Sequence, residues 1–306
     1  MKKIIALAVA GAFVAPVMAA DVTLSGDVEF AFKSQGDNMD FVNGDRDFKI
    51  VASEEINGLS VTATLDMEDG DLASGSADTD LKIAGPFGYI EVGHSGSASG
   101  KFDEVADVAE AGAGTTLTDG YTEDGYILFS PSLGIEGLSV AVSYGVDNST
   151  SANTAGTIAA TGTPAGNVAY AASTAAANST ESVAYAIQYE VAGIKIALGS
   201  EKPEGAALRT SVTSVSGSFG PVYVGYEMLT NNDQTAAGDW TNIGATYDYG
   251  MGKLFVEQNA KDNGTTTTAY GASYKVGSTL NTYLSIEDSD DASIDSATYV
   301  GVEYAF

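Results

Sequence analysis

The strongest constraint on the fold of this 306-residue chain is an alternation of apolar and polar residues that recurs from residue 21 to the end. Successive side chains of a β-strand point to opposite faces, so a period of two residues is typical of strands with one apolar face. The clearest runs are 22–32, 59–67, 138–144, 183–189, 222–228 and 298–306. The 3.6-residue period of a helix is absent beyond residue 20, apart from one weak stretch at 103–110. The alternation therefore predicts an all-β protein.

The connections between these runs alternate in length. Short turns rich in Gly and Pro lie at 55–58, 85–87, 131–136, 191–193, 219–221, 249–252 and 276–278. Longer polar segments lie near 33–45, 68–77, 94–124, 145–180, 201–206, 230–238, 259–265 and 288–295. These seven short and eight long connections join sixteen strands. Transmembrane barrels have short periplasmic turns and long external loops, so we predict an antiparallel transmembrane β-barrel of sixteen strands.

The residues between the apolar positions indicate that the inside of this barrel is wet. The polar faces of the runs carry Asp27, Glu29, Asp66, Lys82, Lys195 and Glu303. A soluble β-sandwich, the alternative fold, would bury one face of each sheet in a dry core, where such charges are costly. A polar interior and an apolar exterior are instead typical of a pore in lipid. The mean hydropathy of +0.03 agrees, because only every second strand residue would face lipid.

The first twenty residues have the pattern of a secretory signal peptide. Lys2 and Lys3 are followed by the apolar run 4–14 and by a small-residue site that predicts cleavage after Ala19 or Ala20. This run is shorter than the roughly 20 apolar residues of a spanning helix. We therefore expect residues 1–20 to be a signal peptide and residues 21–306 to be a single exported barrel domain.

The charge balance limits the partners of the chain. Beyond the two lysines of the signal peptide, 11 basic residues stand against 41 acidic ones, which gives a net charge of −30. Nucleic acid is excluded as a partner, because its binding depends on Lys and Arg neutralising phosphates. A net charge of this size is typical of proteins soluble in high salt, of a cation-attracting surface, or of both. The chain has no cysteine, so disulfides and thiol chemistry are excluded as well.

Three short segments resemble the general porins of Gram-negative bacteria, most closely the alphaproteobacterial type. They are the strand start 21–26, the segment 85–93, which is similar to the family's fifth-strand motif, and the terminal Phe306 with Tyr304 before it. The resemblance implies an outer-membrane homotrimer through which small hydrophilic solutes and ions diffuse passively, without enzymatic chemistry. It also implies that Phe306 and Tyr304 form the signal read by the outer-membrane assembly machinery.

The resemblance further implies a constriction inside the barrel. The third long loop, about 94–124, would fold inward and carry the acids Asp103, Glu104, Asp107 and Glu110. Basic residues of the facing wall would be Lys49, Lys82 and Arg46. Alternation points Lys49 and Lys82 inward, whereas Arg46 shares the parity of Phe48. Only two arginines occur in the chain, so the constriction lacks a dense arginine cluster and we expect cation selectivity.

Three other functions remain open on the sequence. A substrate-specific channel would use inward aromatic residues, for which the candidates are Tyr89, Tyr126, Tyr223 and Tyr283. A structural or adhesive surface barrel would use the long segment 145–180. A hydrolase would need a histidine base, and the chain has only His94, close to Ser95 and Ser97.

Two further features can be read from single clusters. Acidic residues at 69–71 and 288–291 could bind Ca²⁺, which takes oxygen ligands, but solvated loop charge is the favoured explanation and neither cluster has the spacing of a known calcium loop. No other cofactor is expected.

Aromatic residues near strand ends are candidates for the interfacial belts of a membrane protein. They are Tyr144, Phe219, Tyr247, Tyr249 and Phe306, and the facing of Trp240 is undecided.

Overall fold

The structure is a computed structural model that describes residues 21–67, 78–94, 96–102, 108–109, 125–146, 181–203, 209–231, 239–262 and 264–306. The expected signal peptide, residues 1–20, lies outside the described residues. No helix in the described part of the chain is long and apolar enough to cross a membrane.

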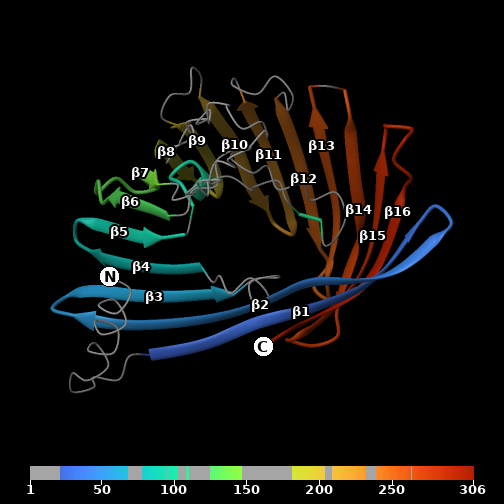
Figure 1. Ribbon diagram of the computed structural model, residues 1–306, viewed down its shortest axis with the longest axis horizontal. Helices are drawn as coiled ribbons and strands as arrows, with labels where there is room; N and C mark the ends of the chain where they lie inside the picture. Colours follow the sequence, from blue (N-terminus) through green and yellow to red (C-terminus); the bar gives the residue numbers. More distant parts are fainter. Residues whose placement is uncertain are drawn as a thin grey trace, which may run out of the picture.

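Sixteen antiparallel strands form one closed barrel, as the sequence predicts, and one 3-10 turn, η1 (Gly100–Phe102), lies between β5 and β6. Each strand pairs with its neighbours in the sequence, and β1 pairs with β16 to close the ring (Figure 1). The strands are β1 (Asp21–Gln35), β2 (Asn38–Ile56), β3 (Leu59–Met67), β4 (Asp78–Gly85), β5 (Gly88–Gly93), β6 (Gly125–Pro131), β7 (Leu138–Val146), β8 (Glu181–Val191), β9 (Ile194–Pro203), β10 (Thr210–Phe219), β11 (Val222–Asn231), β12 (Trp240–Asp248), β13 (Lys253–Lys261), β14 (Thr266–Lys275), β15 (Leu280–Ser289) and β16 (Ala297–Ala305).

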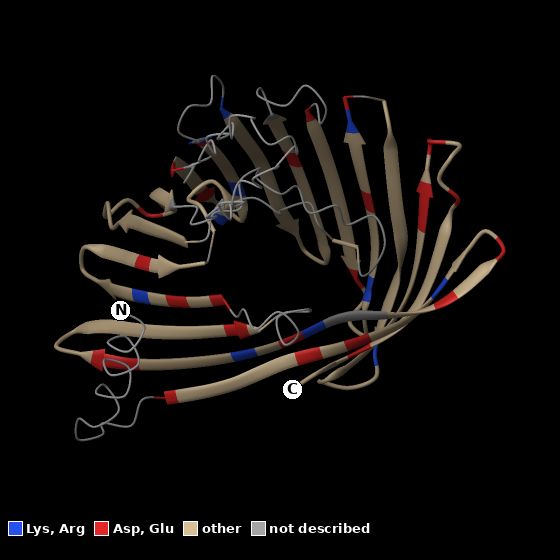
Figure 2. Ribbon diagram, in the orientation of Figure 1, with Lys and Arg blue, Asp and Glu red and all other residues tan. Residues whose placement is uncertain are grey.

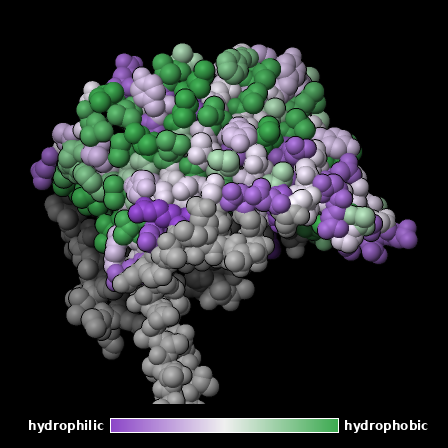
Figure 3. Space-filling model, turned by 90° about the horizontal axis from the view of Figure 1, so that it is seen from above, coloured by the Kyte–Doolittle hydropathy of each residue, from purple (hydrophilic) through white to green (hydrophobic). Residues whose placement is uncertain are grey.

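The two faces of each strand differ in the way that the alternation predicts, as β8 shows most clearly. Its apolar residues Val183, Tyr185, Ile187 and Tyr189 are each 44–49% exposed on the outer face. The small residues between them, such as Ala184 and Ala186, are at most 2% exposed on the inner face. Figure 3 shows broad apolar areas on one side of the molecule. An exterior this apolar requires lipid rather than water around it.

Tight turns at one end of the barrel follow the chemistry of their residues. Asn57 and Gly58 link β2 to β3 with φ angles of 53° and 80°. Positive φ at both central residues is required by a type I′ hairpin turn, which Asn-Gly favours. The seven connections at this end are only two to six residues long, as expected.

The connection between β1 and β2 differs from the prediction of a long loop at 33–45. Strand pairing continues to Gln35 and Asn38, so that Gly36 and Asp37 alone form the turn. The result is a long hairpin that projects beyond the neighbouring strands (Figure 1). The polar residues of 33–40 suggested a loop, although one face of the hairpin keeps the apolar residues Phe32, Met39 and Phe41. The predicted loop segments 201–206 and 259–265 are shortened in the same way, since β9 and β13 continue into them.

Aromatic residues occupy the strand ends on the outer face. Tyr144, Phe219, Tyr247, Tyr249 and Phe306 are 37–62% exposed there. Trp240 faces the interior instead, where it packs against the buried residues Val212 and Leu229.

The carboxyl terminus completes the closure of the barrel. Phe306 and Gly26 exchange two backbone hydrogen bonds, of 3.2 Å and 2.9 Å. The Phe306 ring lies over Gly26 and stacks with Tyr304, with ring centroids 6.3 Å apart. A Cβ atom at Gly26 would meet both the Asp47 carbonyl oxygen and this ring. Glycine is therefore needed where the last residue meets the first strand.

We predict that Gly26→Ala destabilises the barrel by about 1–3 kcal/mol, the usual cost of forcing an extra carbon into a packed site. The matched control is Gly277→Ala in the β14–β15 turn, where an added Cβ meets nothing within 4 Å. Urea unfolding in lipid vesicles, followed by the heat-dependent mobility shift on gels, measures both variants. Equal stability of the two would contradict this account of closure.

Candidate functional site: the barrel interior and loop 3

The segment that links β5 to β6, residues 94–124, is called loop 3 below, and its described residues 97–102 and 108–109 contact the inner wall of the barrel. Its residue Ala98 is fully buried in a small apolar cluster on the inner wall. The other members come from three successive strands and are Leu128 of β6, Ala141 of β7 and Ala184 of β8. Small residues on this part of the wall allow the loop to lie directly against it.

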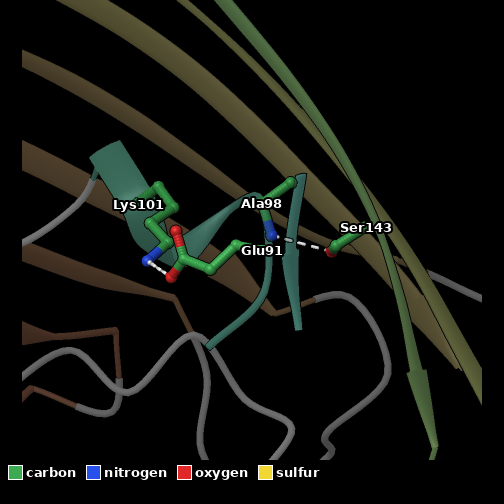
Figure 4. A network of polar contacts seen from close by, with 4 residues as sticks. All are labelled: Glu91, Ala98, Lys101 and Ser143. Atoms are coloured by element: carbon green, nitrogen blue, oxygen red, sulfur yellow. Dashed lines mark hydrogen bonds and ion pairs between the residues drawn. The ribbon is translucent and has the colours of Figure 1, made fainter. Parts of the chain in front are cut away.

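Polar contacts fasten the first part of loop 3 to the wall on both sides of this cluster. The backbone N–H of Ala98 donates to Ser143 Oγ on β7 at 2.8 Å. Lys101 Nζ lies 2.9 Å from Glu91 Oε1 on β5, as an ion pair between a partly exposed lysine and a buried glutamate. Figure 4 shows both contacts: Ala98, just before η1, bonds to β7, and Lys101, within η1, pairs with β5. Charge-assisted bonds of this kind are about twice as strong as neutral ones.

Strand β9 also contacts the first part of the loop. Ser99 Oγ donates to Glu201 Oε2 at 3.2 Å, and Glu201 is fully buried. A Cβ atom at Gly199 would lie only 3.0 Å from the Cα of Ser99. Glycine at this position of β9 therefore provides the space that the loop occupies.

The second described part of loop 3 is held by a different strand. The backbone N–H groups of Val108 and Ala109 donate to Glu257 Oε2 of β13 at 2.8 and 3.0 Å. Asn242 Nδ2 of β12 donates to the other carboxylate oxygen at 3.1 Å, and Glu257 is fully buried. In the ring of sixteen strands, β13 lies halfway round from β5. Loop 3 therefore bridges the barrel interior from the Glu91 side to the Glu257 side.

The acids that the sequence places on loop 3, namely Asp103, Glu104, Asp107 and Glu110, lie outside the described residues. The predicted wall lysines do face the interior. Lys49 Nζ lies 2.6 Å from Asp66 Oδ2 on β3, and Lys82 Nζ lies 4.0 Å from the centroid of the Tyr89 ring.

Arg46 is placed on the other face of its strand. It lies opposite Val28 of β1, and Ile50, four residues further along β2, lies opposite the outward residue Leu24. Residues two and four positions apart share a face of a strand, so Arg46 lies on the outer face. The expectation of Arg46 on the pore wall is corrected by this register.

Carboxylates dominate another part of the inner wall, where β2, β1 and β16 are adjacent. Asp27 lies opposite Asp47 across one pair of strands, and Glu29 lies opposite Glu303 across the next. Figure 2 shows acidic positions gathered on these strands. Like charges directly opposite each other are unfavourable in a sheet, so these carboxylates need compensating partners.

The carboxylates that hold loop 3 were not identified from the sequence. Alternation does indicate that Glu257 faces inward, because Leu254 and Val256 occupy the other face of β13. Its bond to Val108, however, joins residues 149 positions apart. Nothing in the local pattern of either segment signals such a contact.

The candidate calcium cluster at 288–291 is used by the turn between β15 and β16. Asp290 Oδ1 accepts from the backbone N–H of Thr266 at 2.6 Å. Asp291 Oδ1 accepts from the hydroxyl and the backbone N–H of Ser293, and these two bonds lower the pKa of Asp291. The described residues include no group of three or more His, Cys, Asp or Glu side chains that could hold a metal ion. The second candidate cluster, 69–71, lies outside them.

The environment of His94 gives it no catalytic partner in the described part of the loop. His94 is exposed, and its carbonyl accepts from the Gly96 N–H at 2.7 Å. The Ser97 and Ser99 hydroxyls bond to each other at 2.7 Å, while Ser95 lies outside the described residues.

The chain matches one known protein family. A family model described as Gram-negative porin matches residues 6–305. The chain belongs to the Gram-negative porin family. A search of curated protein sequences finds no match.

Solved porin structures share the fold of this family member. A variant of Rhodobacter blastica porin with a lysine and an arginine replaced by alanine has a TM-score of 0.69 at 16% identity. A second variant of the same porin, with an aspartate and a glutamate replaced, has a TM-score of 0.68 at 17% identity. A porin refined at 1.8 Å resolution has a TM-score of 0.64 at 19% identity. Each comparison covers 94% of this chain and 100% of the other.

We predict that Glu257→Ala releases the far end of loop 3. The change removes a buried acceptor of three hydrogen bonds, each worth about 1.5–3 kcal/mol when one partner is charged. Single-channel recordings should then show current fluctuations at least about tenfold more frequent than in the wild type. The control is Glu190→Ala, which removes an inward carboxylate that is 46% exposed and 3.9 Å from Lys195. Recordings from Glu257→Ala that match the wild type would show that this carboxylate does not hold the loop.

Proposed function

We propose that this porin is a water-filled channel in the outer membrane, through which small hydrophilic solutes and ions diffuse passively with a preference for cations. Family membership and fold support the passive channel. The single observation that carries the proposal is a closed barrel with an apolar exterior and a carboxylate-lined interior bridged by loop 3. No chemical step is needed. Solutes enter at the loop end, pass loop 3 and leave at the end with the tight turns.

The described lysines of the inner wall support a preference for cations, because most of them are held by acids or by aromatic rings. Lys49 and Lys101 pair with Asp66 and Glu91. Three others lie over aromatic rings, at 3.9 to 5.3 Å from the ring centroids: Lys33 over Tyr299, Lys82 over Tyr89 and Lys261 over Trp240. The carboxylates of β2, β1 and β16 then set the sign of the field. The Debye length of about 8 Å at 0.15 M salt exceeds a pore radius of a few Å, so the preference persists at ordinary salt.

Loop 3 sets the size limit of the channel in this proposal. Its acids Asp103, Glu104, Asp107 and Glu110 would face Lys49 and Lys82 across the passage. Support comes from the two anchor points of the loop, Glu91 on β5 and Glu257 on β13, which lie on opposite sides of the barrel.

Export by the signal peptide 1–20 and assembly as a homotrimer complete the proposal. Arg46 supports a subunit contact on the outer face of β1 and β2, because a cation that faces lipid is destabilising. A neighbouring subunit would shield it from lipid. Phe306 and Tyr304 are both about half-exposed on the outer face, where the assembly machinery can reach them.

A substrate-specific channel is less well supported. Of its four candidate tyrosines, Tyr126 and Tyr283 are only 5% and 4% exposed. The Tyr283 hydroxyl donates to Glu29, and its ring covers Gly301. These two rings fill space in the wall rather than lining a track for solutes.

We predict that replacing Asp27 and Asp47 together by asparagine reduces the cation preference. Each charge interacts with an ion at 4 Å in water by about 1 kcal/mol, so the K⁺-to-Cl⁻ permeability ratio should fall several-fold. The measurement is the reversal potential in a tenfold KCl gradient. The control replaces Glu54 and Asp288, which lie on the outer face, by Gln and Asn, and so removes the same charge outside the channel. An unchanged reversal potential in the Asp27 and Asp47 variant would contradict the role of these carboxylates.

A further inference from the structure

The pair β1–β16 differs from every other neighbouring pair in the ring of described strands, because no connecting segment joins its two members. The other pairs consist of strands that are consecutive in the sequence, so a turn or loop links them covalently. The first and last strands are held to each other by non-covalent contacts alone. Separation at this pair, called the seam below, would open the barrel into a sheet without breaking any hairpin. The seam is therefore the place where the closed barrel is most easily opened.

The middle of the seam is weak on its inner face. Glu29 of β1 lies opposite Glu303 of β16, and like charges directly opposite each other destabilise a sheet. The next inward pair is Ala31 opposite Gly301, and these residues are too small for their side chains to pack against each other. Two successive pairs therefore contribute little attraction across the seam.

Tyr283 of β15 covers this weak part of the seam. It lies directly opposite Gly301, and a Cβ atom added at Gly301 would overlap the Tyr283 ring and hydroxyl. The side chain therefore lies across β16, in the space that the glycine leaves. Its hydroxyl donates to Glu29 Oε1 on β1, on the far side of the seam. A hydrogen bond to a carboxylate is about twice as strong as one between neutral groups.

Burial strengthens this contact further. Tyr283 is only 4% exposed, and Ala31, which follows Glu29 on β1 and lies opposite Gly301, is 3% exposed. Water therefore has little access to the side of β16 that the ring covers. In surroundings of lower dielectric constant than water, a hydrogen bond to a charged group is stronger.

We propose that Tyr283, Gly301 and Glu29 form a clasp that holds β1 against β15 and β16 and locks the seam against lateral opening. The bond is independent of the backbone ladder, because β15 and β1 are not neighbours in the ring. A second pair of the same geometry lies away from the seam, where Phe255 of β13 covers the directly opposite Gly271 of β14. That ring has no hydroxyl, and the chain already links its two strands. The hydroxyl is present where the strands have no covalent link.

The test measures the rate at which the full-length protein in lipid vesicles unfolds in urea, followed by the heat-dependent mobility shift on gels. Tyr283→Phe keeps the ring over Gly301 and removes only the hydroxyl. It should unfold about tenfold faster than the wild type, the effect expected when a hydrogen bond to a charged group is lost. Gly301→Ala displaces the ring from β16 and should unfold at least as fast as Tyr283→Phe.

An engineered disulfide across the seam separates a clasp from ordinary packing. The chain has no cysteine, so Ser34→Cys with Thr298→Cys places a single disulfide between directly opposite residues of β1 and β16. With the seam closed covalently, Tyr283→Phe should unfold at the same rate as the protein that carries the disulfide alone. The matched control disulfide, Ala272→Cys with Leu284→Cys, joins β14 to β15 and should leave the faster unfolding of Tyr283→Phe in place.

The counterpart away from the seam is Gly271→Ala, whose faster unfolding should persist with the seam disulfide present. The proposal is overturned if Tyr283→Phe unfolds at the wild-type rate. It is also overturned if Tyr283→Phe still unfolds faster after the seam disulfide has formed, because the hydroxyl would then act on local packing and not on opening of the seam.

Discussion

The whole structure depends on one requirement, that every backbone N–H and C=O group in contact with lipid has a partner within the protein. A sheet meets it only by closing on itself, because an open edge strand would leave a row of unpaired groups in hydrocarbon. Here the closing pair is β1 with β16, and the last residue still takes part, through the two bonds between Phe306 and Gly26. Closure also directs one face of all sixteen strands outward and the other face inward. The apolar exterior and the polar channel are therefore two results of the same constraint.

Charge has different roles inside this closed ring. Buried carboxylates act as anchors, since Glu91, Glu201 and Glu257 each bind a group of loop 3. Other carboxylates, such as Asp27 and Asp47, lie opposite one another on the wall and set its field. Lysines whose ammonium groups are held by acids or by aromatic rings reduce this negative field least. A strongly acidic sequence thereby provides the attachment of the loop and, in the proposed function, the attraction for cations.

Much of the fold was predictable because lipid forces a simple rule on every strand. The two-residue period alone placed Val183 and Tyr185 outside and Lys49 and Lys82 inside, and the alternating connections gave sixteen strands. The β1–β2 hairpin was predicted as a loop because residues 33–38 are polar or Gly around its tight turn, although Met39 and Phe41 continue the apolar face. Arg46 was assigned to the pore wall through the resemblance, against its own parity, and the register supports the parity.

The anchors of loop 3 were beyond sequence reasoning for a different reason. Alternation indicates which way Glu257 points but not what it meets, because the contact with Val108 depends on how loop 3 crosses the barrel. The same holds for Gly199, whose missing side chain is needed only because Ser99 lies against it. Long-range contacts inside a barrel depend on its closed geometry, and that geometry cannot be predicted from any single segment of the sequence.

Single-channel recording of the wild-type protein in a planar bilayer tests the central claim most directly. An acid-lined aqueous channel predicts large, steady, ohmic currents that carry more K⁺ than Cl⁻. Protein that is folded, as its heat-dependent gel mobility shows, yet conducts no current would contradict the account.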